Sequence, residues 1–323
     1  MNLLRRDGLV RDHAPRLTPL AGGVSCEIYL VEDGAERFVV KRALAKLKVK
    51  ADWFADVKRN RHEWEFIRYV ARFQPEAVPK LRHSSTAENY FTMEHLNGDF
   101  SNWKEMLLAG KGTDEYAGNA GKLLAQIHGR STGDPEAAKL FDTTPTFFQL
   151  RIEPFLLATG EKNSPLSPMF KAEAERLART RECLVHGDFS PKNILVSTDR
   201  MVLLDGEVAW YGEPAFDLAF LMAHLFLKAL YHAPHASGGR TMIEKFWRAY
   251  QTARPAPELE PRVSRLLLML LLARVDGKSP VEYLNPARQD LVREFVRAKL
   301  PGEIPSLAAI TEAWFTRLHQ FQN

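Results

Sequence analysis

The sequence has 323 residues, and hydrophobic residues make up 45% of them, which is enough to form buried cores in two packed lobes. The 44 basic and 40 acidic side chains leave a net charge of only +4, spread along the chain, so the charge gives no reason to expect a nucleic-acid partner. The two cysteines, Cys26 and Cys183, form no metal-ligand pattern and are expected to be reduced thiols.

The N-terminal residues carry several charges and no sustained apolar stretch, so we expect no signal peptide and a cytoplasmic location. The most apolar segment, 266–273, is eight residues long. A membrane span needs roughly twenty residues. We therefore expect a buried core helix at this segment and no membrane association. The sequence does not indicate an oligomeric state.

The first part of the chain reads as strands with one inserted helix, so we expect a small β-rich lobe over residues 1–94. Apolar residues stand on both sides of a Glu-Asp-Gly turn at 32–34, which predicts a hairpin. The expected strands are 26–31, 37–41, 78–82 and 89–93, and the expected helix is 54–73. The segment 95–99 has no periodicity and is expected to be a hinge.

Helical periodicity dominates the rest of the chain, so residues 100–323 are expected to form a larger, mainly helical lobe. Helices are expected at 114–128, 166–179, 215–231, 240–252, 258–275, 286–299 and 305–320. Prolines stand near the start of several of them, as their fixed φ favours at a first turn. The fold class that follows is α+β, with two lobes.

The strongest functional signal is His-Gly-Asp-Phe-Ser-Pro-Lys-Asn at 186–193, followed by Leu-Leu-Asp-Gly-Glu at 203–207. Asp188 lies on a loop, Asn193 follows five residues later, and two short apolar strands lead to Asp205. Phosphoryl transfer from ATP needs a base near the acceptor hydroxyl and oxygen ligands for magnesium. Asp188 fits the base, and Asn193 and Asp205 fit the ligands. The alternative is a charged surface hairpin, because Asp, Asn and Gly are common in turns.

This spacing resembles the catalytic and metal loops of the kinase-like small-molecule phosphotransferases, the superfamily of aminoglycoside, choline and methylthioribose kinases. The segment 205–218 is similar to the methylthioribose-kinase branch, whereas Asn193 matches the aminoglycoside-kinase pattern, so the branch stays open. The resemblance runs from about Leu17 to about Tyr231 and is weaker beyond. It implies a bilobal protein-kinase-like fold, with a nucleotide-binding first lobe, a catalytic second lobe, and ATP and Mg²⁺ as cofactors.

A glycine-containing turn before residue 26 is the candidate cover for the phosphates of a nucleotide. Gly22 and Gly23 let the backbone approach an anion with its N–H groups directed inward, and Ser25 adds a hydroxyl donor. A Gly-Gly pair before a strand is also typical of a simple turn. The segment lacks the third glycine of the protein-kinase pattern.

Lys41 ends an apolar strand where the resemblance implies a lysine that contacts the α- and β-phosphates and pairs with a helix glutamate. A buried ammonium needs an anionic partner. Glu63, at the edge of the core-facing stripe of the helix, is the preferred partner, and Glu65 is expected to face solvent. By position, Glu94 and Leu96 are the residues expected to hold adenine through their backbone.

Other residues near the motif have secondary or open roles. Glu207 is either a further metal ligand, as the resemblance implies, or a solvated turn residue. His186 and Asp217 are expected to hold the loop backbone by hydrogen bonds rather than to act as bases. Lys192 is expected to be solvated rather than to reach the γ-phosphate.

The acceptor pocket is expected in the helical lobe. By resemblance, Arg274 and Asp276 lie where substrate-facing residues are found, after a long buried helix. Charges directly after an apolar helix also fit C-terminal capping, which the sequence slightly favours. Trp210 and Tyr211 fit either a sugar-stacking surface or the core, and the core is the expectation.

The expected function is ATP-dependent phosphorylation of a hydroxyl group on a small metabolite, a sugar or a sugar-like compound. An aminoglycoside acceptor is a second candidate, but such a polycation favours an acidic pocket, and the last third of the sequence has only scattered acidic residues. An inactive nucleotide-binding module that regulates a partner is a third candidate. The joint presence of the candidate site residues argues against it, and the lack of paired Asp-Phe-Gly and Ala-Pro-Glu motifs argues against a protein kinase.

Overall fold

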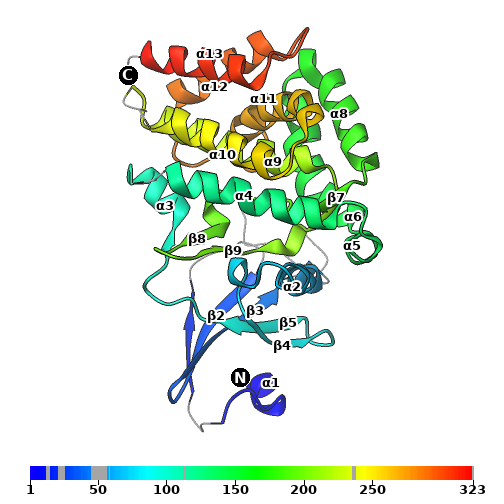
Figure 1. The fold of residues 1–323 in the computed structure, drawn as a ribbon, viewed down its shortest axis with the longest axis vertical. Helices are drawn as coiled ribbons and strands as arrows, with labels where there is room; N and C mark the ends of the chain where they lie inside the picture. The colour runs from blue at the N-terminus through cyan, green and yellow to red at the C-terminus, as the bar shows by residue number, and fades with distance from the viewer. Residues whose placement is uncertain are drawn as a thin grey trace.

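The computed structural model describes residues 1–11, 15–20, 26–44, 57, 59–111, 114–234 and 238–321. An antiparallel sheet forms one end of the molecule, and helices form most of the remainder (Figure 1). The sheet has the strand order β1–β2–β3–β5–β4, with bounds Arg16–Pro19, Cys26–Asp33, Glu36–Ala43, Tyr90–Glu94 and Leu81–Ser85 in that order. The predicted α+β fold with a small β-rich lobe and a larger helical lobe is confirmed.

The two faces of the sheet have different neighbours because side chains alternate along each strand. In β3, Phe38 belongs to a small core with Leu4, from the short helix α1 (Asn2–Arg6). Val39, one residue later, belongs to the large core that continues into the helical lobe. Lys41 shares the face of Val39, and the register sets it between Ile28 of β2 and Phe91 of β5. The strand therefore presents its single lysine toward the space between the lobes.

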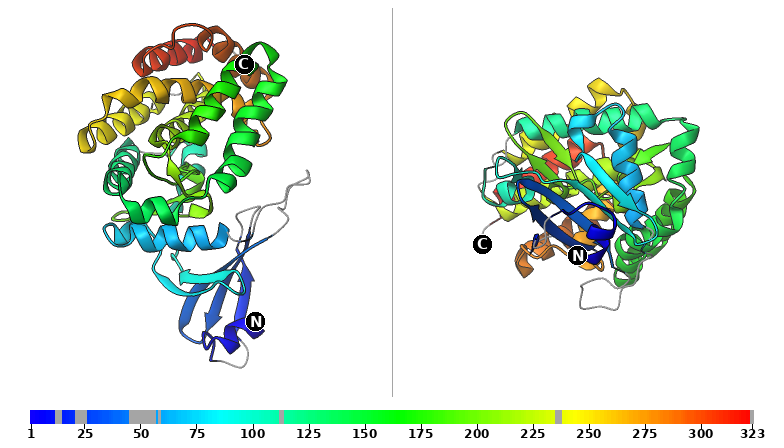
Figure 2. Two further views of the ribbon diagram at one scale, coloured as in Figure 1. Left: turned by 90° about the vertical axis from the view of Figure 1, so that its right-hand side faces the viewer. Right: turned by 90° about the horizontal axis from the view of Figure 1, so that it is seen from below.

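The helix α2 (Arg59–Val70) lies between the sheet and the helical lobe, where it is drawn in light blue in Figure 2. Its Phe66 packs edge-on against the ring of His186, with 5.0 Å between the ring centroids. Phe66 also contacts Gly206, where a Cβ atom would stand only 2.8 Å from the phenyl ring. The same helix thus meets the strand that carries Lys41 and the loops that carry Asp188 and Asp205.

The helical lobe is built around two apolar helices, α9 (Pro214–Tyr231) and α11 (Glu260–Asp276). Residues 266–273 are fully buried in α11, so the predicted core helix is confirmed. By length and composition α9 could cross a membrane, but 94% of it is buried inside the fold. The other helices are α3 (Trp103–Leu108), α4 (Asp114–Ser131), α5 (Pro135–Leu140), α6 (Thr144–Phe147), α7 (Ala158–Lys162), α8 (Ser167–Arg179), α10 (Gly239–Ala253), α12 (Pro286–Lys299) and α13 (Leu307–His319).

Two small antiparallel pairings hold the loops of the sequence motif between the lobes. One pairs β7 (Cys183–Val185) with β10 (Trp210–Gly212), and the other sets β8 (Ile194–Val196) between β6 (Ser101–Asn102) and β9 (Met201–Leu203). The segment 186–193 leaves β7 and enters β8, and the segment 204–209 leaves β9 and enters β10. Both loops are therefore fixed at each end by strand pairing.

The predicted helices and strands mostly agree with the structure within a few residues. The strand expected at 78–82 begins at Leu81 and follows a 3-10 turn at residues 75–77. The strands β1, β6 and β10 and the short helices before residue 166 were not predicted from the sequence. Among them is a π-helical segment, η2 (Phe148–Leu157), which contains Pro154 and has the wide turn that places Arg151 inward.

Candidate active site

Lys41, Glu63 and Asp205 form a buried ionic triad between the two lobes. The Nζ of Lys41 lies 2.7 Å from Glu63 Oε2 and 2.5 Å from Asp205 Oδ1. Asp205 has a φ of 66°, a left-handed conformation that an L-residue adopts at an energetic cost and that clusters at functional sites. The triad joins β3, α2 and the loop after β9, which lie far apart in the sequence.

The electrostatics of the triad favour an ammonium–carboxylate pair between Lys41 and Asp205. Burial opposes the charge on Lys41, but Asp205 and Glu63 raise its pKa well above the usual value. Burial also opposes the charge on Asp205, but Lys41 outweighs it and holds the pKa of Asp205 below its usual range. For Glu63 burial prevails and raises the pKa. Lys41 and Asp205 are therefore charged at neutral pH.

Asp188 lies in the neighbouring loop with its carboxylate held by two cations. Its Oδ2 lies 2.9 Å from Lys192 Nζ and 3.0 Å from Arg151 Nη2. Burial opposes ionisation, but Lys192 and Arg151 lower the pKa of Asp188. Asn193 Nδ2 donates to the backbone oxygen of Asp188 at 3.0 Å, which leaves Asn193 Oδ1 as the amide atom able to bind a cation. The loop therefore fixes the amide relative to the carboxylate.

His186 and Asp217 hold this loop in shape, as expected. Asp217 accepts hydrogen bonds from the backbone N–H groups of His186 and Gly187, at 2.7 and 2.9 Å. The Nδ1 of His186 accepts from the backbone N–H of Asp188, and its Nε2 lies 3.0 Å from the carbonyl oxygen of Leu204. The ring thereby links the Asp188 loop to the Asp205 loop. Both side chains act through the backbone.

A cavity of about 700 Å³ opens between the lobes beside the triad. Its lining includes Lys41, Glu63, Asn193 and Asp205 together with Glu94 and Leu96. Apolar side chains from both lobes complete it: Leu20, Ile28, Val39, Met93, Leu195 and Leu204. The carboxylate of Glu94 accepts from Lys80 N and Arg200 Nη2, so it points away toward other protein groups. A long, partly apolar cavity with charges at one side suits a nucleotide.

Gly22, Gly23 and Ser25, the predicted phosphate cover, lie outside the described residues. Among the described residues, Glu207 does not line the cavity. Glu207 is only 7% exposed, so the solvated alternative was wrong. Its Oε2 pairs with Arg59 Nε at 3.1 Å, an arrangement different from the one expected of a metal ligand.

The two candidate acceptor residues separate in the structure. Asp276 accepts from Arg293 Nε at 2.9 Å and from Asn163 Nδ2 at 3.0 Å, so it ties helices of the core together and is not placed as a substrate-facing group. Arg274 donates to Ser279. Burial lowers the pKa of Arg274, and the nearby Tyr283 and Asp188 oppose this shift. Arg274 therefore lies near the site, whereas Asp276 has a structural role between helices.

Lys192 is exposed, as expected, and its Nζ also lies 2.9 Å from Asp188 Oδ2. Two other charged residues were misjudged or missed from the sequence. Glu65, expected to face solvent, is 6% exposed and pairs with Arg68 at 2.6 Å. Arg151 was not singled out at all, although an arginine in an otherwise apolar stretch is a signal for a buried anionic partner.

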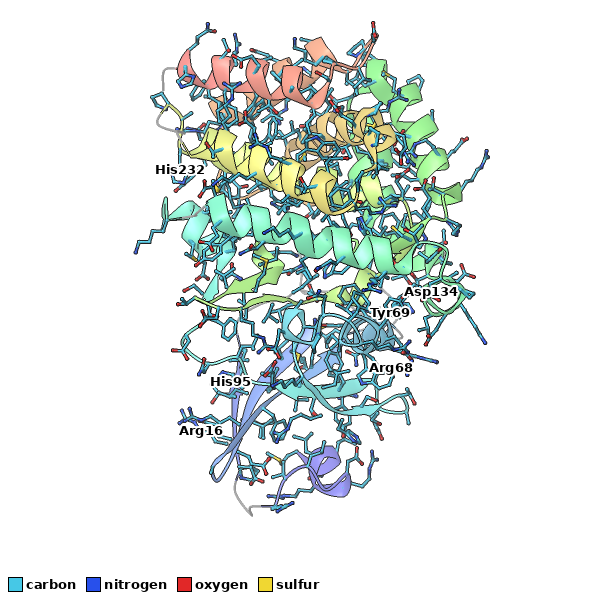
Figure 3. All side chains as sticks on the ribbon, in the orientation of Figure 1. Arg16, Arg68, Tyr69, His95, Asp134 and His232 are labelled. Atoms are coloured by element: carbon cyan, nitrogen blue, oxygen red, sulfur yellow. The ribbon has the colours of Figure 1, made fainter. Side chains whose placement is uncertain are left out.

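Further contacts connect the lobes on two sides of the cavity. On one side, Arg200 in the turn after β8 pairs with Glu94 at 2.7 Å. On the other, the Tyr69 hydroxyl of α2 donates to Asp134, and the two residues lie together in Figure 3. Arg72 and Glu136 add an exposed ion pair beside them. These contacts set the spacing of the lobes around the cavity.

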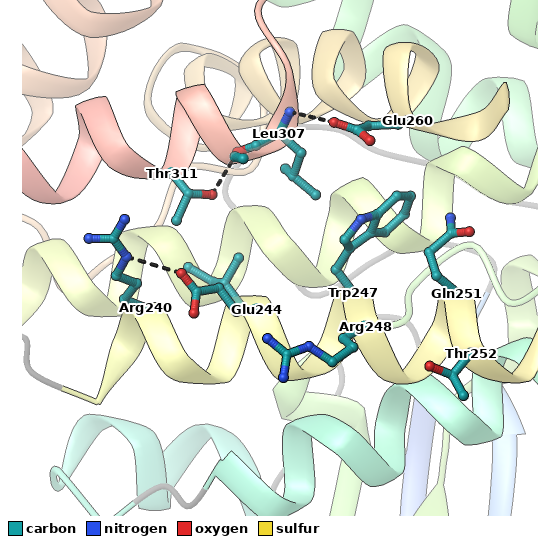
Figure 4. A pocket seen from close by; sticks show the side chains of 11 residues that line it. Arg240, Glu244, Trp247, Arg248, Gln251, Thr252, Glu260, Leu307 and Thr311 are labelled. Atoms are coloured by element: carbon teal, nitrogen blue, oxygen red, sulfur yellow. Dashed lines mark hydrogen bonds and ion pairs between the residues drawn. The ribbon is translucent and has the colours of Figure 1, made fainter. Parts of the chain in front are cut away.

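A second hollow, of about 570 Å³, lies between α10 and the start of α13 (Figure 4). Its walls include Arg240, Trp247, Gln251 and Glu260. It contains none of the candidate site residues.

Comparisons with known proteins show a family match and similar sequences. A family model described as "Phosphotransferase enzyme family" matches residues 16–259. A methylthioribose kinase of Geobacillus kaustophilus is 26% identical over 263 residues, which are 70% of this chain and 64% of the relative. One from Exiguobacterium sibiricum is 25% identical over 275 residues, 76% of this chain and 70% of the relative. The match to the first of these therefore spans less than two thirds of that protein's length.

Two solved structures show the same fold. An amicoumacin kinase in complex with AMP-PNP, Ca²⁺ and Ami superimposes with a TM-score of 0.59 at 15% identity, covering 94% of each chain. An ethanolamine kinase of Plasmodium vivax superimposes with a TM-score of 0.56 at 13% identity, covering 98% of this chain and 85% of the other.

Proposed function

The chain belongs to the phosphotransferase enzyme family, and from this membership we propose that it transfers the γ-phosphoryl group of ATP to a hydroxyl group of a small molecule. One observation carries the proposal. Lys41, Asn193 and Asp205 line the same cavity, and Asn193 is bonded to the backbone of Asp188. A phosphate-binding cation, two oxygen ligands and a base are thus assembled at one place.

Each of these residues has a defined task in the reaction. Asp188 orients the acceptor hydroxyl and accepts its proton, and its lowered pKa keeps it ionised for that purpose. Lys41 binds the α- and β-phosphates. Asn193 Oδ1 and the Asp205 carboxylate fit Mg²⁺, which prefers oxygen ligands and completes its shell with water and phosphate. Bound there, the ion supplies neutralisation of the phosphate charge, the main requirement of a loose phosphoryl-transfer transition state.

Among the residues that the structure describes, no three His, Cys, Asp or Glu side chains gather into a metal site of their own. Adenine would lie at the Glu94–Leu96 end of the cavity and bond the backbone there, with Gly22, Gly23 and Ser25 as the expected phosphate cover.

The finer proposal is a sugar or sugar-like acceptor, because the curated relatives are named for methylthioribose. A cytoplasmic location is proposed with it. The buried pairing of Lys41 with Glu63 and Asp205 counts against an inactive module. A buried ionic group contributes little to the stability of a core, so its presence is better explained by a function.

The substitution Asp188→Asn tests the catalytic assignment. It should lower turnover of ATP in the presence of an acceptor by at least roughly a hundredfold, the effect expected of losing a general base. The affinity for AMP-PNP, measured by calorimetry, should stay within a few-fold. Turnover retained at the wild-type rate would remove Asp188 from its role.

The matched variant Lys41→Ala, unlike Asp188→Asn, should lower the affinity for the nucleotide. Its loss removes the contact to the phosphates, so AMP-PNP affinity should fall by about tenfold or more. Unchanged affinity in this variant would count against the phosphate contact while leaving Asp188 untouched.

A further inference from the structure

Lys228, in the last turn of the apolar helix α9, is a buried lysine without a counter-ion among the described residues. Its side chain is almost fully buried, with 3% of the residue exposed. Within the described part of the chain its Nζ has no hydrogen-bond partner, and its charge lies over the ring of Tyr283 at 5.2 Å. A buried ammonium normally has an anionic partner, because desolvation of the charge is unfavourable. The partner of Lys228 is therefore not supplied by the residues described.

The neighbours of Lys228 add positive charge. Burial, together with the charges of Arg274 and Lys104, lowers the pKa of Lys228 to about 7. Arg274 also has a buried Nε without a partner among the described residues. We refer to Lys104, Lys228 and Arg274 as the cation cluster. Among the described residues, the acidic group that acts on Lys228 is Glu282, whose carboxylate is already paired with Lys104.

Two members of the cation cluster lie near the base or the cavity. Arg274 and Arg151 lie over the same ring, that of Phe155, each at 5.7 Å, and Arg151 is the partner of Asp188. Lys104 lines the cavity beside Asn193. An acceptor whose hydroxyl meets Asp188 would therefore have the rest of its body near these three cations.

We propose that the acceptor carries an anionic group, a carboxylate or a phosphate ester, next to the hydroxyl that is phosphorylated, and that Lys228 and Arg274 bind this group. The inference rests on the proposed function and names the class of its substrate. It opposes a polycationic acceptor such as an aminoglycoside, which the cation cluster would repel. An anion near Lys228 supplies the counter-ion that the described residues do not provide.

Binding of small anions tests the proposal directly in the full-length protein. With AMP-PNP and Mg²⁺ in excess to occupy the nucleotide site, D-ribose 5-phosphate, D-gluconate, D-ribose and kanamycin are each titrated while thermal unfolding is followed. One or both anions should raise Tm, and ribose and kanamycin should not. The rise should be largely lost in Lys228→Met and kept in Lys171→Met, which removes an exposed lysine of α8.

Turnover provides the second measurement. Among the same four compounds, an anionic acceptor should exceed ribose by about tenfold in kcat/KM, and Lys228→Met should remove that advantage. Kanamycin as the best acceptor, or an anion response that persists unchanged in Lys228→Met, would overturn the proposal.

The experiments distinguish a failure of the proposed kinase activity from a failure of the proposed anion site. Anion stabilisation that depends on Lys228 without any ATP turnover would contradict the kinase activity and support the anion site. Turnover of neutral sugars alone, with no Lys228-dependent stabilisation by anions, would support the kinase activity and contradict the anion site.

Discussion

The charge of Lys228 also has a consequence for stability that is independent of any substrate. In the unfolded chain a lysine has a pKa of about 10.4, whereas in the folded protein that of Lys228 is lowered to about 7. The unfolded state therefore binds more protons between these two values, so this residue makes stability rise with pH across that window. Below about pH 7 its unfavourable contribution is fully present. The charged or titratable groups around it are Arg274, Lys104, Glu282, Tyr283 and His224.

Replacement of this lysine by methionine should stabilise the protein at neutral and acidic pH. Lys228→Met should raise Tm by about 3 °C or more near pH 6, since one kcal/mol shifts Tm by roughly this amount in a domain of this size. The gain should shrink toward pH 10, where the wild-type residue is neutral in the folded state. Thermal unfolding at three pH values checks this, with Lys171→Met as the control. A Tm difference that does not vary with pH would contradict the lowered pKa.

At the level of single residues, the sequence was informative where a motif fixed the chemistry. The convergence of Asn193 and Asp205 on one cavity, and the pairing of Lys41 with Glu63, follow from their positions in the chain. Arg151 and Lys228 were not predicted as site residues. Each lies in an apolar helical stretch, and the periodicity of such a stretch does not indicate which charged residue will lie next to it in the fold. Their neighbours come from elements more than thirty residues away, as the Arg151–Asp188 pair shows.

At the level of elements, α4 and α10 pack closely because a glycine stands at their contact. A Cβ atom on Gly121 would lie 2.4 Å from the backbone oxygen of Phe246, an atom that cannot rotate away. Gly118, one turn earlier in α4, has nothing within 4 Å of the same position. The two glycines therefore have the same helical backbone and opposite surroundings.

Alanine at these two positions should change stability in opposite directions. Gly121→Ala should lower the free energy of unfolding by about 1–3 kcal/mol, the usual effect of overpacking. Gly118→Ala should raise it by up to about 1 kcal/mol, the difference in helix propensity. Chemical denaturation of both variants measures the pair. Stabilisation by both substitutions would show that the two helices have room to move apart.

The long helices of the helical lobe were predicted correctly, because their apolar residues either recur with helical periodicity or form a continuous apolar run. It failed for η2 (Phe148–Leu157), since the π-helical turn and Pro154 break the usual spacing of three and four residues. The short strands β7 and β10 pair over only three residues each, and their pairing follows from tertiary packing rather than from alternation. These weakly patterned segments are nevertheless the ones that carry Arg151 and hold the loop of Asp188.

At the level of the whole molecule, the two lobes share α2 rather than meeting across a flexible joint. Figure 1 shows this helix beneath the helical lobe and above the sheet. It supplies Glu63 to the triad, and its Phe66 rests on Gly206 in the loop that carries Asp205. A displacement of α2 would therefore separate charged groups that line the cavity together. The bilobal arrangement was predictable from the change of pattern near residue 95, but this shared helix was not.

Gly206→Ala should uncouple the lobes without removing any charged group. The added methyl would lie 2.8 Å from the ring of Phe66, so α2 must shift away from the Asp205 loop. We expect a lower Tm together with a loss of AMP-PNP affinity of about tenfold, because Glu63 and Lys41 move relative to Asp205. Gly98→Ala, in the connection between the lobes, has nothing within 4 Å and should leave both values near wild type. Calorimetric titration and thermal unfolding measure the two effects. Normal nucleotide affinity in Gly206→Ala would mean that the position of α2 is not set by this contact.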